Sequence, residues 1–141
     1  YSSAASDVYK RQVLERGGIK IGVFGVSPKM EGLVQADKCE GIVYNDPIVA
    51  AQEVTDLLRT KEGCDVVICL SHLGFRLKNE VCDEKLAAAT RGTNVILGGH
   101  SHTFMEKPAF CLNAEEKSIP VLHTGRSGIF VGELDLTLTK E

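Results

Sequence analysis

Two short histidine-bearing segments hold the side chains of this sequence that are best suited to chemistry. In the first, His72 follows the apolar run VVICL; in the second, His100 and His102 follow VIL and two glycines. Neutral imidazole is a common ligand for zinc, manganese and iron in proteins. A lone histidine after a strand is more often a hydrogen-bonded loop residue. Two such segments in equivalent places favour a metal site.

The elements around these segments predict that they meet. Apolar, β-branched runs predict strands at residues 19–26, 64–72 and 94–99. Asp46-Pro47 predicts a helix that ends near Gly63, and a second helix is expected from Asp83 to Arg91. A β-α-β-α-β order implies a parallel sheet. Because ligands bind at the carboxyl ends of such strands, the histidines are expected at one edge.

The spacing of His100 and His102 bears on how they would bind metal. The His-x-His spacing suggests that the two rings serve different ions of a dinuclear site rather than chelating one ion. Metals roughly 3.5–4 Å apart activate water and bind phosphate during displacement at phosphorus. His123, within PVLHTG, has no comparable partner and is expected to be a core or hydrogen-bonded histidine.

The end of the chain differs in character from the β-α-β-α-β part. Residues 108–113, 119–124 and 129–139 are strand-like, and ELDLTLT alternates with a period of two. We therefore expect antiparallel strands after the parallel core. The predicted class is α/β, a sandwich whose second sheet is completed late in the chain.

Composition excludes several classes of protein. The 141 residues are 43% hydrophobic and 25% charged with a net charge of −3, which gives no electrostatic case for nucleic-acid binding. No apolar run approaches the roughly 20 residues that span a bilayer. The five cysteines form no Cys-x-x-Cys pair and are expected to be unpaired structural thiols. Residues 1–12, YSSAASDVYKRQ, resemble an adapter-derived, non-native tail, so the native chain would begin before Val13.

Three stretches together carry a family resemblance: DVVICLSHLG, NVILGGHSHT and PVLHTGRSGIFVGELDLTL. They resemble the C-terminal half of the metallophosphatase domain in the calcineurin-like metallophosphatase superfamily, bacterial 5′-nucleotidase branch. The resemblance implies that residues 13–141 form part of a four-layer α/β/β/α sandwich that binds two divalent ions, such as zinc, manganese or iron. It assigns His72 and His100 to one metal and His102 to the other.

The resemblance also has a gap. The N-terminal half of the family domain brings an Asp-x-His pair, a Gly-Asp motif and a Gly-Asn-His motif, and this sequence contains none of them. We expect a parent phosphomonoesterase, and an isolated chain that is an inactive fragment with at most weak metal binding. A phosphodiesterase or UDP-sugar hydrolase of the same fold is the alternative. The parent is expected to be a periplasmic or cell-surface monomer that acts on nucleotides or other phosphomonoesters, without nucleic acid or a membrane span.

Overall fold

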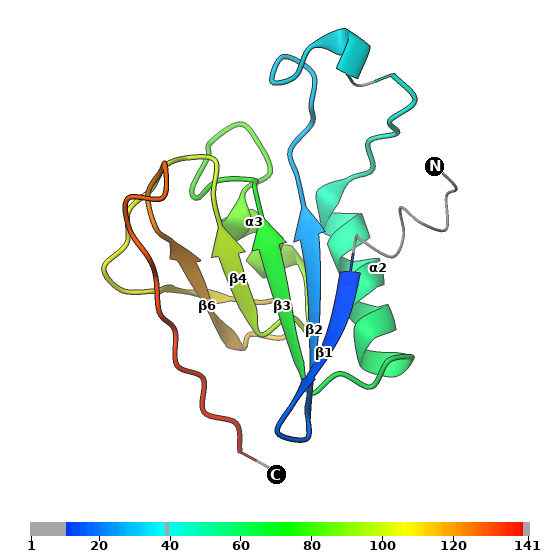
Figure 1. Ribbon diagram of the computed structural model, residues 1–141, viewed down its shortest axis with the longest axis vertical. Helices are drawn as coiled ribbons and strands as arrows, with labels where there is room; N and C mark the ends of the chain where they lie inside the picture. Colours follow the sequence, from blue (N-terminus) through cyan, green and yellow to red (C-terminus); the bar gives the residue numbers. More distant parts are fainter. Residues whose placement is uncertain (1–10, 39, 140–141) are drawn as a thin grey trace.

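The computed structural model describes residues 11–38 and 40–139. Its described strands form one six-stranded sheet with the order β1-β2-β3-β4-β6-β5 (Figure 1). β2, β3, β4 and β6 are parallel, and β1 and β5 lie antiparallel at the two edges. The strands are β1 (Arg11–Arg16), β2 (Ile19–Val26), β3 (Val66–Ser71), β4 (Val95–Gly98), β5 (Ala109–Leu112) and β6 (Ser118–His123). The α/β class and the order of parallel then antiparallel strands are as predicted.

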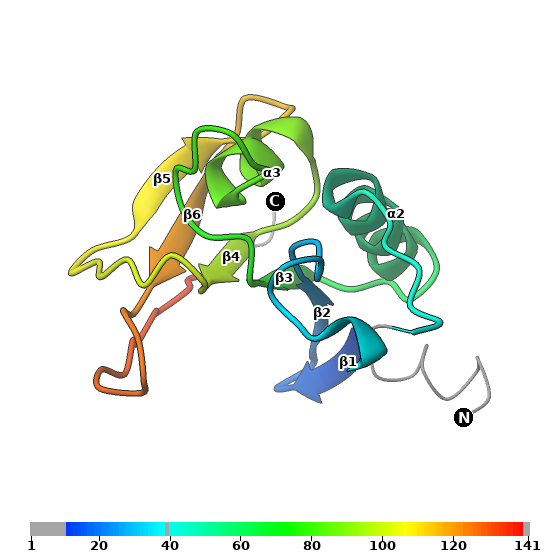
Figure 2. The same cartoon turned by 90° about the horizontal axis from the view of Figure 1, so that it is seen from above.

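The two α-helices among the described residues cover one face of this sheet, as the view from above shows (Figure 2). They are α2 (Pro47–Thr60) and α3 (Asp83–Ala89); a short 3-10 helix, η1 (Ala36–Lys38), lies in the loop between β2 and α2. The core fills the space between helices and sheet. Its fully buried members include Leu58, Val67, Leu86, Ile96 and Val121. The described residues thus supply one helical layer and one sheet of a layered α/β fold.

The start of α2 follows directly from its sequence. The Asp46 side chain accepts hydrogen bonds from the backbone N–H groups of Ile48 and Val49, at 2.8 and 3.1 Å. Pro47 occupies the first helical position, where a missing N–H costs nothing. This confirms the predicted cap and gives the crossover from β2 to β3 a defined beginning.

Helix α3 begins at Asp83 as predicted but ends at Ala89, two residues before the expected Arg91. Thr90 is extended rather than helical, and its hydroxyl donates to the carbonyl of Leu86 at 2.7 Å. That bond satisfies a carbonyl at the helix end and competes with further helical turns. The shorter helix brings the chain into β4, which precedes His100.

Arg59, near the end of α2, ties together the amino ends of β3 and β4. Its guanidinium donates to the carbonyl oxygens of Gly92 (2.7 and 2.9 Å), Cys64 (2.9 Å) and Asp65 (2.7 Å), and to the side chain of Asn94. Hydrogen bonds to a charged donor are stronger than neutral ones. Arg59 therefore stabilises the edge of the sheet opposite to the histidines.

We expect Arg59→Ala to lower the free energy of unfolding by about 2–3 kcal/mol, because several carbonyl groups lose a charged donor. Urea denaturation followed by circular dichroism measures this. Arg91→Ala is the matched control, since the Arg91 side chain makes an exposed pair with Asp56 at 3.5 Å and such pairs contribute at most about 1 kcal/mol. Equal losses in the two variants would contradict the role of Arg59.

The second face of the sheet carries no helix among the described residues. Leu70 of β3 and Leu97 of β4 alternate with core residues and point to this face, where they remain 46% and 36% exposed. The C-terminal segment runs along the same side, next to β6 (Figures 1 and 2). A cavity of about 460 Å³ separates it from the sheet, with Phe130 and Leu136 among its lining residues. The apolar run in β3 therefore has a second face that the described residues only partly cover.

Two expectations about the end of the chain are corrected. Residues 129–139 alternate like a strand, but within the described chain they form none. A strand needs a neighbour for its backbone hydrogen bonds, and none of the described strands pairs with them. The second sheet expected late in the chain is also not formed by β5 and β6, because β6 pairs with β4 and extends the first sheet.

The N-terminal hairpin was not predicted. Residues 1–10 of the expected tail lie outside the described residues, but Arg11 and Gln12 belong to β1, which pairs with β2.

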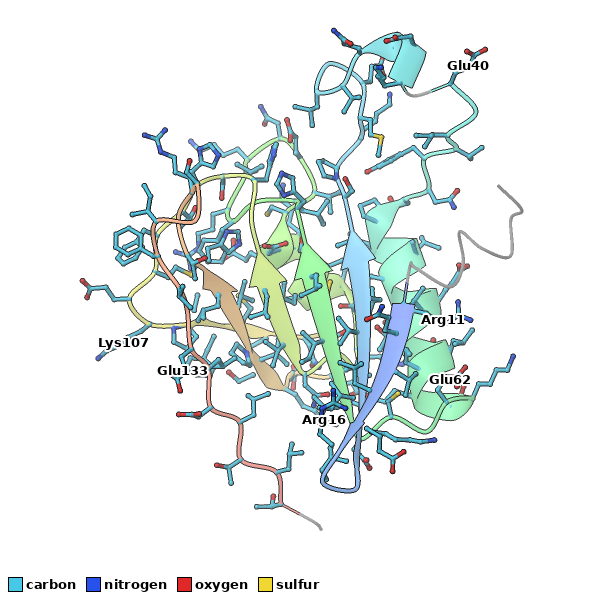
Figure 3. The ribbon with its side chains drawn as sticks, viewed as in Figure 1. Arg11, Arg16, Glu40, Glu62, Lys107 and Glu133 are labelled. Carbon is cyan, nitrogen blue, oxygen red and sulfur yellow. The ribbon has the colours of Figure 1, made fainter. Side chains whose placement is uncertain are left out.

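The charged side chains of Glu40, Lys107 and Glu133 point outward at the periphery of the molecule (Figure 3). None of the described helices is long and apolar enough to cross a membrane.

The cysteines behave as predicted wherever they are described. Cys64, Cys69, Cys82 and Cys111 are free and buried, whereas Cys39 lies outside the described residues. Burial raises the pKa of the Cys64, Cys69 and Cys111 thiols. They therefore stay protonated at neutral pH, which makes them poor metal ligands.

Candidate functional site

The parallel sheet brings His72 and His100 together. His72 follows the last residue of β3, and its backbone N–H donates to the carbonyl of Val26 at 2.9 Å. His100 follows β4, the neighbouring strand, after one further glycine. The two ring centroids are 5.1 Å apart, with the ring planes inclined at 61°. The predicted convergence of the two strand ends is therefore present for these two histidines.

Glycine allows this approach. A Cβ atom added at Gly99 would lie 3.2 Å from Nδ1 of His72, which is tighter than most real contacts of a Cβ. The His72 ring thus occupies space beside the Gly99 backbone. The Gly-Gly pair before His100 lets the second loop pass close to the first histidine.

The segment from His100 to His102 is not an extended strand continuation. His100 and His102 have φ angles of 75° and 52°, in the left-handed region that is uncommon for residues other than glycine. Between them, Ser101 Oγ accepts from the Phe75 N–H at 3.0 Å and lies 2.8 Å from Thr103 Oγ1. These bonds join the two histidine loops and stabilise a locally strained backbone, which is a frequent feature of functional sites.

His102 does not join the other two. It is exposed, and within residues 11–38 and 40–139 no three His, Cys, Asp or Glu side chains form a group that could hold a metal ion. The described site therefore offers a pair of imidazoles. Two nitrogen donors fit part of the ligand set of a zinc, manganese or iron ion, and further ligands would have to complete it.

A buried aspartate–histidine pair lies next to these loops and was not predicted from the sequence. His123, the last residue of β6, is 1% exposed, and its Nε2 lies 2.6 Å from Oδ2 of Asp83, which is fully buried. This confirms that His123 is a hydrogen-bonded core histidine. The sequence predicts Asp83 only as the start of a helix, because acidic side chains are seldom fully buried. A buried residue of this type needs a partner, and His123 was the available one.

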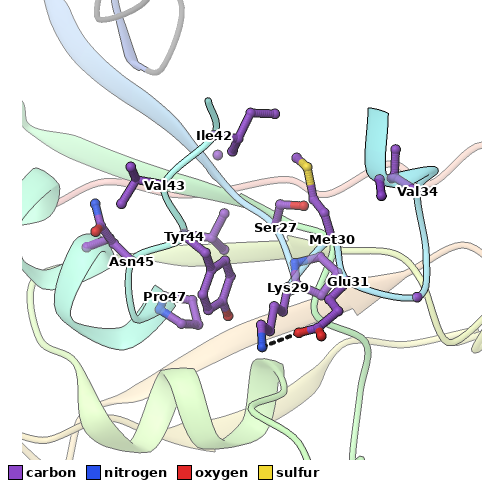
Figure 4. A pocket seen from close by; sticks show the side chains of 16 residues that line it. Ser27, Lys29, Met30, Glu31, Val34, Ile42, Val43, Tyr44, Asn45 and Pro47 are labelled. Atoms are coloured by element: carbon purple, nitrogen blue, oxygen red, sulfur yellow. Dashed lines mark ion pairs between the residues drawn. The ribbon is translucent and has the colours of Figure 1, made fainter. Parts of the chain in front are cut away.

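Two adjoining cavities lie in and beside the loop between β2 and α2. One, of about 580 Å³, is lined largely by apolar residues together with Tyr44 and the ion pair of Lys29 with Glu31 (Figure 4). The other, of about 500 Å³, shares these three residues with the first and is also bordered by His100. A hollow therefore opens beside one of the two paired histidines.

The chain resembles several curated proteins, although no protein-family model matches it. It is 33% identical over 141 residues to the 5′-nucleotidase of Diplobatis ommata, an alignment that covers 91% of this chain and 23% of that protein. It is 29% identical over 129 residues to the trifunctional nucleotide phosphoesterase protein YfkN of Bacillus subtilis, covering 92% of this chain and 8% of that protein. The chain thus spans less than a quarter of either relative.

Solved structures show the same fold. The calcineurin-like phosphoesterase YfkN of Bacillus subtilis superposes with a TM-score of 0.60 at 23% identity, over 82% of this chain and 41% of that one. The NAD nucleotidase NadN of Haemophilus influenzae superposes with a TM-score of 0.62 at 20% identity, over 81% of this chain and 24% of that one. At these identities the likeness supports the fold alone.

Proposed function

The chain belongs to the metallophosphatases of the 5′-nucleotidase family, and from this premise we propose that it contributes part of the active site of a metal-dependent phosphomonoesterase. Nucleotides are the proposed substrates, since the two curated relatives are named as a 5′-nucleotidase and as a nucleotide phosphoesterase. The contact between the His72 and His100 rings supports the proposal most strongly. It joins two loops that are far apart in the sequence and that each carry an imidazole near their start.

In this proposal His72 and His100 bind one divalent ion through ring nitrogens. Such ions, when bound, would polarise the phosphoryl group and activate water. The protein's own part is to hold the two rings side by side. Gly99 leaves room for the His72 ring, and Ser101 fastens the second loop to the backbone of Phe75.

His102 is assigned to a second ion by family resemblance, and that ion needs ligands beyond the described residues. We therefore propose that the 141 residues by themselves bind one ion weakly and do not turn over substrate. We propose that the organic group of the substrate lies in the cavity of about 500 Å³ that His100 borders.

A periplasmic or cell-surface location is also part of the proposal. Its support is the similarity to a snake venom 5′-nucleotidase from Naja atra, which is 25% identical over 149 residues. Separating periplasmic from cytoplasmic fractions of the source cells, with an antibody against this chain, would test it.

The activity is tested with a complete polypeptide that contains these residues. We expect release of phosphate from AMP and from p-nitrophenyl phosphate in the presence of Mn²⁺ or Zn²⁺, and its loss when EDTA is added. Parallel assays with UDP-sugars and cyclic nucleotides distinguish a monoesterase from a diesterase of the same fold. Turnover that survives EDTA would contradict the proposed metal dependence.

A further inference from the structure

Asp83 and His123 form a buried pair directly behind the two histidine loops. Asp83 is the first residue of α3 and His123 the last residue of β6; they are 0% and 1% exposed. Asp83 Oδ2 and His123 Nε2 lie within hydrogen-bond distance of each other. Their 2.6 Å separation joins a helix start to the end of a strand.

The pair is connected to the backbone on both sides of His72. The second carboxylate oxygen of Asp83 accepts a hydrogen bond from Ser71 Oγ, and that hydroxyl accepts one from the Leu73 N–H at 3.1 Å. His72 is the residue between Ser71 and Leu73. The conformation of its backbone is therefore linked to the position of the Asp83 carboxylate.

The same pair also supports the loop of His100. A Cβ atom added at Gly98, the last residue of β4, would lie 2.0 Å from His123 Nε2 and 2.1 Å from Asp83 Oδ2. The end of β4 thus rests directly on the pair, and His100 follows two residues later. Both loops of the proposed metal site therefore start beside the side chains of Asp83 and His123.

Stability alone is a poor explanation for this arrangement. Ionised or polar side chains are costly to bury, and apolar residues of similar size are often as stabilising or more so. In addition, Nδ1 of His123 is buried and has no hydrogen-bond partner among the described residues. This cost falls at a place that contacts both histidine loops.

We propose that Asp83 and His123 are positioning residues that hold His72 and His100 in the arrangement needed to bind a divalent ion. The role rests on the function proposed above, because it concerns the same site. Partners behind metal ligands commonly change metal affinity by about 10–100-fold when they are altered. The proposal requires such an effect without direct contact between these two residues and the ion.

The test compares Zn²⁺ affinity of the 141-residue chain, measured by isothermal titration calorimetry, across a set of variants. We expect Asp83→Asn and His123→Leu to weaken binding by about 10–100-fold. His123→Gln should restore near-normal affinity, because its amide can still donate to Asp83. Ser71→Ala, a milder change that removes only the link to His72, should weaken binding in the same direction.

Arg59→Ala is the matched control for stability. It removes bonds at the opposite edge of the sheet, so it should lower the melting temperature while leaving Zn²⁺ affinity within about twofold of the wild type. Affinity in Asp83→Asn and Ser71→Ala that equals the wild type would overturn the proposal. An equal loss of affinity in Arg59→Ala would do the same.

A second readout needs no metal. In the metal-free chain, the NMR ring signals of His72 and His100 should shift in Asp83→Asn or Ser71→Ala, while those of the separate His102 stay in place. Unchanged His72 and His100 signals would refute the positioning role even if Zn²⁺ binds. A wild-type chain that binds no Zn²⁺ would instead count against the proposed function, whatever the ring signals show.

Discussion

Replacing His100 with alanine is expected to reduce phosphate release by at least about 1,000-fold in a complete polypeptide that contains this chain. His100 supplies one of the two imidazoles that meet at 5.1 Å, and a metal ion contributes several kcal/mol of transition-state stabilisation, of which about 4 kcal/mol corresponds to this factor. Steady-state assays with AMP and Mn²⁺ measure the loss. The fold should be retained, since His100 is not part of the core.

Further variants distinguish which histidine binds which of the two proposed metal ions. His102→Ala should also abolish turnover, but in the isolated chain it should leave Zn²⁺ affinity unchanged, because His102 does not join the His72 and His100 pair. His72→Ala should reduce both the turnover of the complete polypeptide and the Zn²⁺ affinity of the isolated chain. Lys78→Ala, an exposed change in the loop after His72, is the control and should leave both unchanged. Near-normal turnover in His100→Ala would refute the assignment.

Gly98→Ala is expected to have the largest effect on stability. Its new Cβ atom would lie about 1 Å inside the closest contacts that real Cβ atoms make, against the side chains of both His123 and Asp83. Neither side chain has free space, since both are buried. We expect a loss of about 3–5 kcal/mol in the free energy of unfolding, because overpacking a core costs about 1–3 kcal/mol and separating a buried hydrogen-bonded pair costs about 1–3 kcal/mol more.

Urea denaturation measures this loss, with Gly25→Ala as the matched control. Gly25 is also a strand glycine, but the nearest atom to its added Cβ is the Leu70 carbonyl oxygen at an ordinary 3.7 Å. That variant should stay within about 1 kcal/mol of the wild type, as expected for a glycine in a strand interior. Similar unfolding free energies for the two variants would show that the Asp83–His123 pair can move aside.

The elements with strong local signals were predictable from the sequence. β2 has the predicted bounds, and α2 begins at the predicted Asp46-Pro47 cap, because short-range hydrogen bonds and side-chain periodicity determine both. β1 was not predicted, and residues 129–139 were wrongly predicted to form a strand. β1 is mostly polar and is held by its pairing with β2, whereas residues 129–139 alternate correctly but have no pairing strand among those described.

The site was predictable only in part, for a similar reason. The convergence of His72 and His100 follows from parallel topology. The left-handed backbone at His100 and His102 does not follow from the topology, since it depends on the hydrogen bonds that Ser101 makes with the neighbouring loop. Asp83 could have been found only by asking which group would satisfy a histidine buried in the core.

The most direct measurement is a Zn²⁺ titration of the isotope-labelled 141-residue chain, followed by the NMR ring signals of its histidines. If His72 and His100 bind one ion together, their signals will change in a single saturable step with a common affinity, and buried His123 will not compete for the ion. Signals of His72 and His100 that do not respond, or that respond independently with different affinities, would contradict a shared metal site.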